Sequence, residues 1–171
     1  IILKSGSSSA GAEAASSHTG ALAGSDLAFD TSFRQSGIIR VETMAELFDL
    51  GLAFSKAPLP RGDNVAIITN GGGGGVVTVD AMEKADLKLV QFDEETTAKL
   101  KKCVTEEGSA KNPIDVLGDA PADRYEKTLE VVLQESNIDS VIVMACPTAS
   151  YKAMEVGQAI VEAKKTSDKP I

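Results

Sequence analysis

The stretch that decides the fold is Val65-Ala66-Ile67-Ile68-Thr69-Asn70, followed directly by Gly71-Gly72-Gly73-Gly74-Gly75. Five apolar or β-branched residues in succession are typical of a strand that is buried on both faces. The glycines form a turn, and a helix is expected over about residues 76–84. A strand, a glycine-rich turn and a helix in this order predict one βα unit of a parallel sheet.

The same alternation continues to the end of the chain. Further strands are expected at residues 87–92 and 140–146, and further helices after Asp93 and from Pro147 onward. Asp93 is expected to cap its helix, because a carboxylate there can accept the free amides of the first turn. The pattern predicts an α/β fold with right-handed βαβ units around a mostly parallel sheet. Ligands of such sheets bind at the carboxyl ends of the strands.

Upstream of the central strand, the chain shows a second, shorter pattern. Phe29 and Phe33 are spaced for one helix face, Gly37 is placed to end that helix, and Thr43 with Glu46 forms a capping box. The run Pro58-Leu59-Pro60-Arg61-Gly62 is typical of a stiff linker. We therefore expect one domain over residues 1–57, a linker over 58–63 and a second domain over 64–171.

Residues 5–25 are small and polar, and they contain the only histidine, His18. One interpretation is a flexible linker; the other is a loop whose backbone amides approach a bulky anion. An imidazole titrates near neutral pH and can accept a phosphoryl group and pass it on. His18 is thus a candidate phosphoryl carrier.

Composition excludes several classes. The net charge of −8 argues against nucleic-acid binding, and no apolar run approaches the length of a membrane span. Cys103 and Cys146 lack the spacing of a zinc site or a disulfide framework, which fits a reducing, cytoplasmic compartment. Both ends of the chain resemble interrupted strands, so a piece of a larger polypeptide is expected.

Three loops are candidate ligand sites. The glycines at 71–75 precede a helix N-terminus that favours anions, although a tight turn without a ligand, or a dinucleotide site that uses Asp93, fits the same spacing. Pro147-Thr148-Ala149-Ser150 is expected to open a helix, where Thr148 or Ser150 either caps the helix or contacts a phosphate. Asn112-Pro113-Ile114-Asp115 is either an Asx/Pro turn or part of a ligand site.

Several of these motifs occur in one known family in the same order. The segment around His18, Ala15-Ser16-Ser17-His18-Thr19-Gly20-Ala21-Leu22-Ala23-Gly24-Ser25-Asp26, resembles the phosphohistidine signature of ADP-forming (NDP-forming) acyl-CoA synthetases. Further similarities are Lys4-Ser5-Gly6, Phe33-Arg34-Gln35-Ser36-Gly37-Ile38, Ile68-Thr69-Asn70-Gly71-Gly72 with Asp80-Ala81, and Lys111-Asn112-Pro113-Ile114-Asp115-Val116. Two positions depart from the family: Gly73 stands at a usual proline, and Asp86 at a usual glycine.

The resemblance implies a fold and a reaction. The expected fold is a flavodoxin-like parallel sheet with helices on both faces, as in succinyl-CoA synthetase, preceded by the C-terminal part of a second such domain. The reaction interconverts acyl-CoA, ADP and phosphate with the acid, ATP and CoA, through an acyl phosphate and a phosphohistidine, with Mg²⁺ accompanying the nucleotide. The implied acid is a short-chain or aryl acid. The implied partners are a CoA-binding domain and an ATP-grasp part, fused or in a second subunit, within an oligomer.

The resemblance also implies roles for particular residues. His18 carries the phosphoryl group, its loop is shaped by Thr19, Gly20 and Gly24, and the phosphate-facing helix starts hold Asn70, Gly71, Gly72, Gly73, Thr148 and Ser150. Two other functions remain open: a non-catalytic module that senses a CoA ester or nucleotide, and a generic dinucleotide-binding domain.

Overall fold

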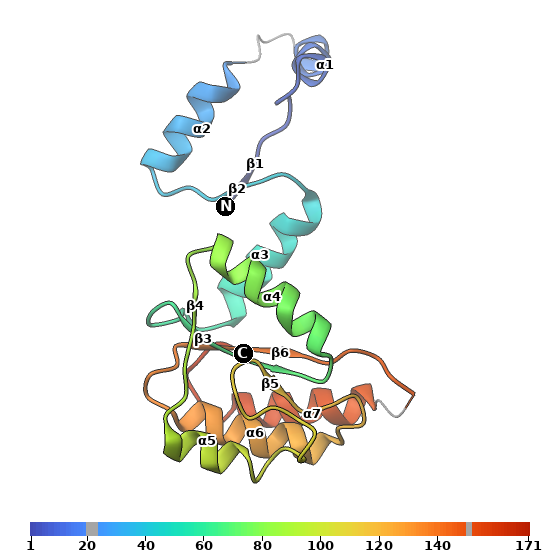
Figure 1. Cartoon of the computed structure of the whole chain (residues 1–171). Helices are drawn as coiled ribbons and strands as arrows, with labels where there is room; N and C mark the ends of the chain where they lie inside the picture. Colours follow the sequence, from blue (N-terminus) through green and yellow to red (C-terminus); the bar gives the residue numbers. More distant parts are fainter. Residues whose placement is uncertain (20–23, 150–151) are drawn as a thin grey trace. The chain divides into compact units, whose positions relative to one another are not determined.

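The structure is a computed structural model that describes residues 1–19, 24–149 and 152–171. The chain divides into two compact units, Ile1–Ala57 and Pro58–Ile171. Figure 1 labels the helices and strands of both units. Among the described residues of both units, no helix combines the length and the apolar character needed to cross a membrane.

The described residues of the first unit, 1–19 and 24–57, form a two-stranded parallel sheet and three helices. Its elements are β1 (Ile2–Leu3), α1 (Ser9–Thr19), α2 (Asp26–Gln35), β2 (Arg40–Val41) and α3 (Met44–Lys56). In the sheet, Ile2 lies opposite Arg40 and Leu3 opposite Val41.

The helix ends in this unit follow the sequence prediction. Gly37 has a φ of 67° just beyond the end of α2, where the amide of Ile38 donates to the carbonyl of Phe33 at 2.8 Å. This left-handed conformation is open to glycine without strain. At the start of α3, the Glu46 amide donates to Thr43 Oγ1 at 3.1 Å, and the Thr43 amide donates to the Glu46 carboxylate at 3.2 Å. The predicted capping box is therefore confirmed.

Helix α1 is a correction to the expected Ser/Gly loop around His18. The segment Ser-Ala-Gly-Ala-Glu-Ala-Ala-Ser-Ser-His-Thr is helical from Ser9 to Thr19. Alanine is the strongest helix former, and four alanines lie in this segment. Ser8 supplies the start, because its side-chain oxygen accepts the Gly11 amide at 3.1 Å.

The second unit alternates strands and helices, as predicted. Its elements are β3 (Asn64–Thr69), α4 (Gly72–Lys84), β4 (Lys88–Leu89), α5 (Glu94–Leu100), β5 (Ile114–Asp115), α6 (Ala122–Gln134), β6 (Ser140–Met144) and α7 (Ala153–Lys164). Strand β3 lies in the centre and pairs in parallel with β4, β5 and β6.

The two edges of β3 are used differently. Along one edge β6 pairs continuously, from Val65 opposite Ser140 to Thr69 opposite Met144. Along the other edge, β4 pairs with the first two residues of β3 and β5 with the last two. A gap in the ladder therefore lies between β4 and β5.

The side chain of Asn112 fills this gap. Its Oδ1 accepts the Ile67 amide at 2.9 Å, while its Nδ2 donates to the carbonyls of Val65 at 2.9 Å and Val90 at 3.0 Å. One side-chain amide thus does the work of a missing strand peptide. The hydrogen-bonding atoms of Asn112 are taken up by strands far away in the sequence, so its side chain forms neither the expected Asx turn nor part of a ligand site.

The sheet has helices on both faces, which confirms the predicted flavodoxin-like architecture (Figure 1). Alternate residues of β3 point to opposite cores: Val65 and Ile67 pack with Met82 of α4, and Ala66 and Ile68 pack into the larger cluster. The larger cluster takes its helical side chains from α5, α6 and α7: Leu100, Tyr125, Leu129, Val132 and Val156.

Two helix starts differ from the prediction. Helix α4 begins at Gly72, not near residue 76, so the glycines form its first turn. Helix α7 begins at Ala153, with Lys152 at its N-cap position. The expectation that Pro147-Thr148-Ala149-Ser150 opens this helix is therefore wrong.

Candidate functional site

His18 lies in the last turn of α1 and is exposed. Its ring is therefore carried by the end of a helix. Gly20 lies outside the described residues, and of Thr19 only the helical backbone is described. Gly24 lies close to α2, because a Cβ at this position would come within 2.8 Å of Cε2 of Phe29. A side chain larger than that of glycine would force the Phe29 ring, which is 40% exposed, to shift.

In the second unit, the carboxyl ends of β3 and β6 are joined by one buried side chain. Asn70 follows β3 and is 5% exposed. Its Nδ2 donates to the Cys146 carbonyl at 2.9 Å, and its Oδ1 accepts the Cys146 amide at 2.6 Å. This two-way bond fixes the turn that leads from β3 into α4.

The start of α4 is open to solvent. Gly71 is the N-cap, and its amide donates to Thr69 Oγ1 at 3.0 Å. Gly72 and Gly73 are exposed, and nothing lies within 4 Å of the space where a Cβ of Gly73 would stand. The first amides of a helix have no partner within the helix, and the helix dipole favours a negative charge before them. This end of α4 can therefore receive an anionic group such as a phosphoryl oxygen.

The remaining glycines of this turn pack against neighbouring strands. A Cβ on Gly74 would come within 2.9 Å of Cε of Met144, and one on Gly75 within 3.2 Å of Cγ2 of Thr69. The glycine run thus combines close packing on its inner side with an open backbone on its outer side.

The loops after β5 and β6 complete the same edge. Asp115 Oδ1 accepts the Leu117 amide at 2.9 Å, and Leu117 has the left-handed φ of 68°. Such a conformation costs a leucine about 1–2 kcal/mol. Thr148 Oγ1 donates to the Gly118 carbonyl at 2.6 Å, so this hydroxyl joins the two loops instead of capping α7.

The structure therefore brings together all of the described residues that were predicted as site residues in the second unit. Asn70, Gly71, Gly72, Gly73 and Thr148 all lie at the carboxyl edge of the sheet, and Ser150 lies outside the described residues.

Sequence reasoning assigned no role at this edge to Cys146, whose Sγ would lie 3.0 Å from a Cβ on Gly71. The signal that could have found it is its place directly after the expected strand end.

The alternative dinucleotide site required a free Asp93. Instead, Asp93 Oδ1 accepts the Thr96 amide at 2.7 Å at the start of α5. This backbone hydrogen bond also holds the pKa of Asp93 below its usual value. The carboxylate acts as the predicted helix cap, a structural role that explains Asp93 without a dinucleotide.

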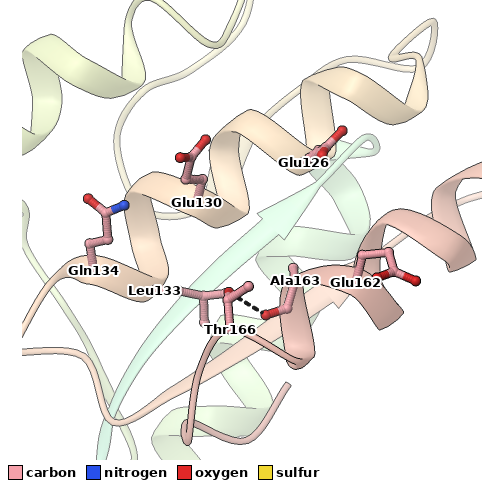
Figure 2. A pocket seen from close by; sticks show the side chains of 7 residues that line it. All are labelled: Glu126, Glu130, Leu133, Gln134, Glu162, Ala163 and Thr166. Carbon is pink, nitrogen blue, oxygen red and sulfur yellow. Dashed lines mark hydrogen bonds between the residues drawn. The ribbon is translucent and has the colours of Figure 1, made fainter.

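A separate groove lies between α6 and α7, away from this edge (Figure 2). Its lining residues are Glu126, Glu130, Leu133, Gln134, Glu162, Ala163 and Thr166. Three carboxylates repel a phosphate, so this groove does not fit the anionic ligand that α4 favours.

The comparisons with known proteins match both units. Residues 1–54 match the family described as succinyl-CoA ligase like flavodoxin domain, and residues 65–170 match the Ligase-CoA domain. A 4-hydroxybutyrate–CoA ligase (ADP-forming) of Nitrosopumilus maritimus is 42% identical over 96% of this chain and 24% of its own length. An acetate–CoA ligase (ADP-forming) of Archaeoglobus fulgidus is 40% identical over 94% of this chain and 23% of its own length.

Solved structures agree with these relatives. A dinucleotide-forming acetyl-coenzyme A synthetase of Ca. Korarchaeum cryptofilum, in complex with phosphate and ADP, matches with a TM-score of 0.90 and 36% identity. The match covers 99% of this chain and 37% of that one. The chain thus spans about a quarter to two fifths of the lengths of these relatives.

The parallel sheet, the helices on both faces and the glycine-rich start of α4 define a flavodoxin-like α/β protein of the CoA-ligase type. The chain belongs to the Ligase-CoA domain family, and its relatives named above are ADP-forming acyl-CoA and acetate–CoA ligases. The resemblance inferred from the His18 and Asn70 motifs is confirmed.

Proposed function

We propose that this chain is the phosphoryl-relay part of an ADP-forming acid–CoA ligase, with His18 as the phosphorylated residue. The observation that carries the proposal is the exposed imidazole at the end of α1, within a chain that matches ADP-forming ligases over almost its whole length. An exposed imidazole can act as a nucleophile that receives and returns a phosphoryl group.

The proposed reaction has three balanced steps. Phosphate displaces CoA from acyl-CoA and forms an acyl phosphate. An imidazole nitrogen of His18 then attacks the phosphorus, the bond to the acyl oxygen breaks, and the free acid leaves. Finally ADP takes the phosphoryl group from His18 and becomes ATP. We propose that the acid is a short-chain or aryl acid, as the resemblance to the family implies.

The first amides of α4 are the proposed anion site of the second unit. Phosphoryl transfer needs positioning and charge stabilisation more than covalent help. Backbone amides fixed by the Asn70–Cys146 bond provide both without any rearrangement during the reaction. Asn70, Gly71, Gly72 and Gly73 are accordingly proposed to face the phosphoryl group.

The rest of the machinery is proposed to come from other parts of the protein. CoA and ATP/ADP would be held by a CoA-binding domain and an ATP-grasp part, fused or in a second subunit, in an oligomer. Mg²⁺ would accompany the nucleotide, because this ion is usually held by substrate phosphates together with one or two carboxylates. The free thiols of Cys103 and Cys146 support a cytoplasmic, reducing location.

The test is an acid-release burst in the intact ligase. Acyl-CoA and phosphate are supplied without ADP, so that turnover stops at the phosphoenzyme. We expect one equivalent of free acid per site with the natural chain and none with His18→Asn. A full burst from His18→Asn would overturn the proposal. Binding of the CoA ester without any burst from the natural chain would instead support the non-catalytic sensing module.

A further inference from the structure

The segment that carries His18 follows a strand of the small sheet in the first unit and ends at the start of α2, and these two points are neighbours. It begins after β1, at Lys4, and it ends at Asp26, the first residue of α2. Twenty-one residues therefore separate two side chains that meet: Lys4 Nζ lies 3.1 Å from Asp26 Oδ1.

Asp26 also binds a third element. Both terminal nitrogens of Arg40, the first residue of β2, donate to the two carboxylate oxygens of Asp26 at 3.0 Å each. This paired geometry fixes direction as well as distance. The two cations are well shielded, with side-chain exposures of 14% for Lys4 and 13% for Arg40. The Arg40 bond, and then the Lys4 bond, hold the pKa of Asp26 below its usual value, so the carboxylate is charged at neutral pH.

The ring of Phe29 closes the same corner. Lys4 Nζ lies 5.0 Å from the centre of this ring, and Gly24 is pressed against the ring edge. Both ends of the His18-bearing segment thus touch one residue of α2. A cation over an aromatic face adds to the ion pair that holds the base of the segment closed.

Helix α1 gains little attachment from complete burial of its own side chains. Among residues 9–18 none is fully buried, and the half-buried positions are Gly11, Ala12, Ala15 and Ser16. Because its packed face is only half-buried, the helix is also placed by the parts of the chain that flank it. The Lys4–Asp26–Arg40 cluster fixes Lys4 and Asp26, which bound the His18 segment on its two sides.

We propose that Asp26 is a positioning residue for His18: by binding Lys4 and Arg40 together, it sets where α1 and its imidazole stand. This inference rests on the proposed function, because it concerns the speed at which His18 receives the phosphoryl group. Asp26 does not touch the reacting atoms. A displacement of about 1 Å at the reacting group costs roughly 100-fold in rate, so loss of the cluster is expected to slow phosphorylation by about 10- to 100-fold.

The experiment measures single-turnover phosphorylation of His18 in the intact ligase, from acyl-CoA and labelled phosphate. Asp26→Asn keeps the size of the side chain and removes its charge. Asp49→Asn, a change at an exposed carboxylate of α3, is the matched control. Asp26→Glu restores the carboxylate. The circular dichroism spectrum and the KM for acyl-CoA are recorded for each variant, so that a change in folding or in binding of acyl-CoA can be told from a change in the rate of phosphorylation.

We expect Asp26→Asn to slow phosphorylation by 10-fold or more with KM and folding unchanged, Asp26→Glu to recover most of the rate, and Asp49→Asn to match the natural chain. The inference is overturned if Asp26→Asn reacts within twofold of the natural rate, or if its loss tracks only the fraction of unfolded protein. His18→Asn serves as the separate arm. If His18→Asn still takes up phosphate, the proposed function fails; if it does not, while Asp26→Asn is fast, only the positioning role fails.

Discussion

Replacing Asn112 by alanine should weaken the second unit severely. The change removes three hydrogen bonds, to the Ile67 amide and to the carbonyls of Val65 and Val90. Val65 is 1% and Ile67 0% exposed, so water reaches their backbone groups poorly. Each buried polar group left without a partner costs about 1–3 kcal/mol. The Val65 carbonyl keeps the Val90 amide as a partner at 3.1 Å, so the Ile67 amide and the Val90 carbonyl are the two groups that lose theirs. With partial relaxation around these two groups, we expect a loss of about 2–5 kcal/mol, a large fraction of the roughly 5–15 kcal/mol that stabilises a typical domain.

Urea unfolding followed by circular dichroism measures this loss. Asn112→Asp separates the contributions, because a carboxylate can still accept the Ile67 amide but cannot donate to either carbonyl. It should therefore also destabilise. Asn137→Ala, at an exposed turn position, is the control and should change stability by less than about 0.5 kcal/mol. A loss below about 1 kcal/mol for Asn112→Ala would refute the idea that this side chain replaces a strand peptide.

Three further predictions concern backbone conformation and helix ends. Asp86 has a φ of 56° just beyond α4, so Asp86→Gly should stabilise the protein by about 1 kcal/mol. Gly37→Ala, at a φ of 67° with open space around it, should destabilise the protein by about the same amount. Thermal unfolding measures both variants, and equal midpoints would contradict the left-handed conformation at these two positions. Gly73→Ala should stabilise α4 by about 0.5–1 kcal/mol, because the new Cβ contacts nothing. Gly75→Ala should destabilise the protein, because the new Cβ would lie 3.2 and 3.4 Å from two side chains. If urea unfolding showed that both variants are more stable than the natural chain, the packing around Gly75 would be contradicted. The backbone hydrogen bond from Thr96 holds the pKa of Asp93 in the folded protein below its unfolded value of about 3.9, so the stability that Asp93 contributes is complete above that value and is lost as the pH falls through the lower folded pKa. The free energies of unfolding of the natural chain and of Asp93→Ala should therefore differ at pH 6 and converge near pH 2. A difference that stays constant with pH would contradict this prediction.

Much of the second unit could be predicted because local and tertiary signals agree there. The buried run of β3, the cap at Asp93 and the alternation of strands and helices each follow from short-range patterns. The ends of α2 and α3 in the first unit were predicted for the same reason, from Gly37 and from the Thr43–Glu46 pair.

The wrong predictions, for the segment of α1 and for the start of α4, share a physical cause. Small residues are ambiguous, since alanine and serine form helices or loops according to their neighbours, and α1 was predicted as a loop on its serines and glycines. Glycines weaken a helix but do not forbid one. Helix α4 begins with four glycines, and the absence of side chains at Gly74 and Gly75 lets its backbone pack closely against Met144 and Thr69.

Long-range ties were beyond sequence reasoning. Asn70 was singled out through a motif, but its bond to Cys146 joins residues 76 positions apart. Asn112 bridges strands in a way that no periodicity encodes. The Lys4–Asp26–Arg40 cluster likewise becomes visible only when the two ends of the His18 segment meet.

The most direct test of the central claim is the chemical nature and place of the phosphoenzyme. The intact ligase is incubated with labelled phosphate and acyl-CoA in the absence of ADP, then split into two samples held in acid and in base. The account predicts one label per site that is lost in acid, survives in base, maps to the peptide containing His18 and is absent from His18→Asn. A label that survives acid, or one that persists in His18→Asn, would contradict it.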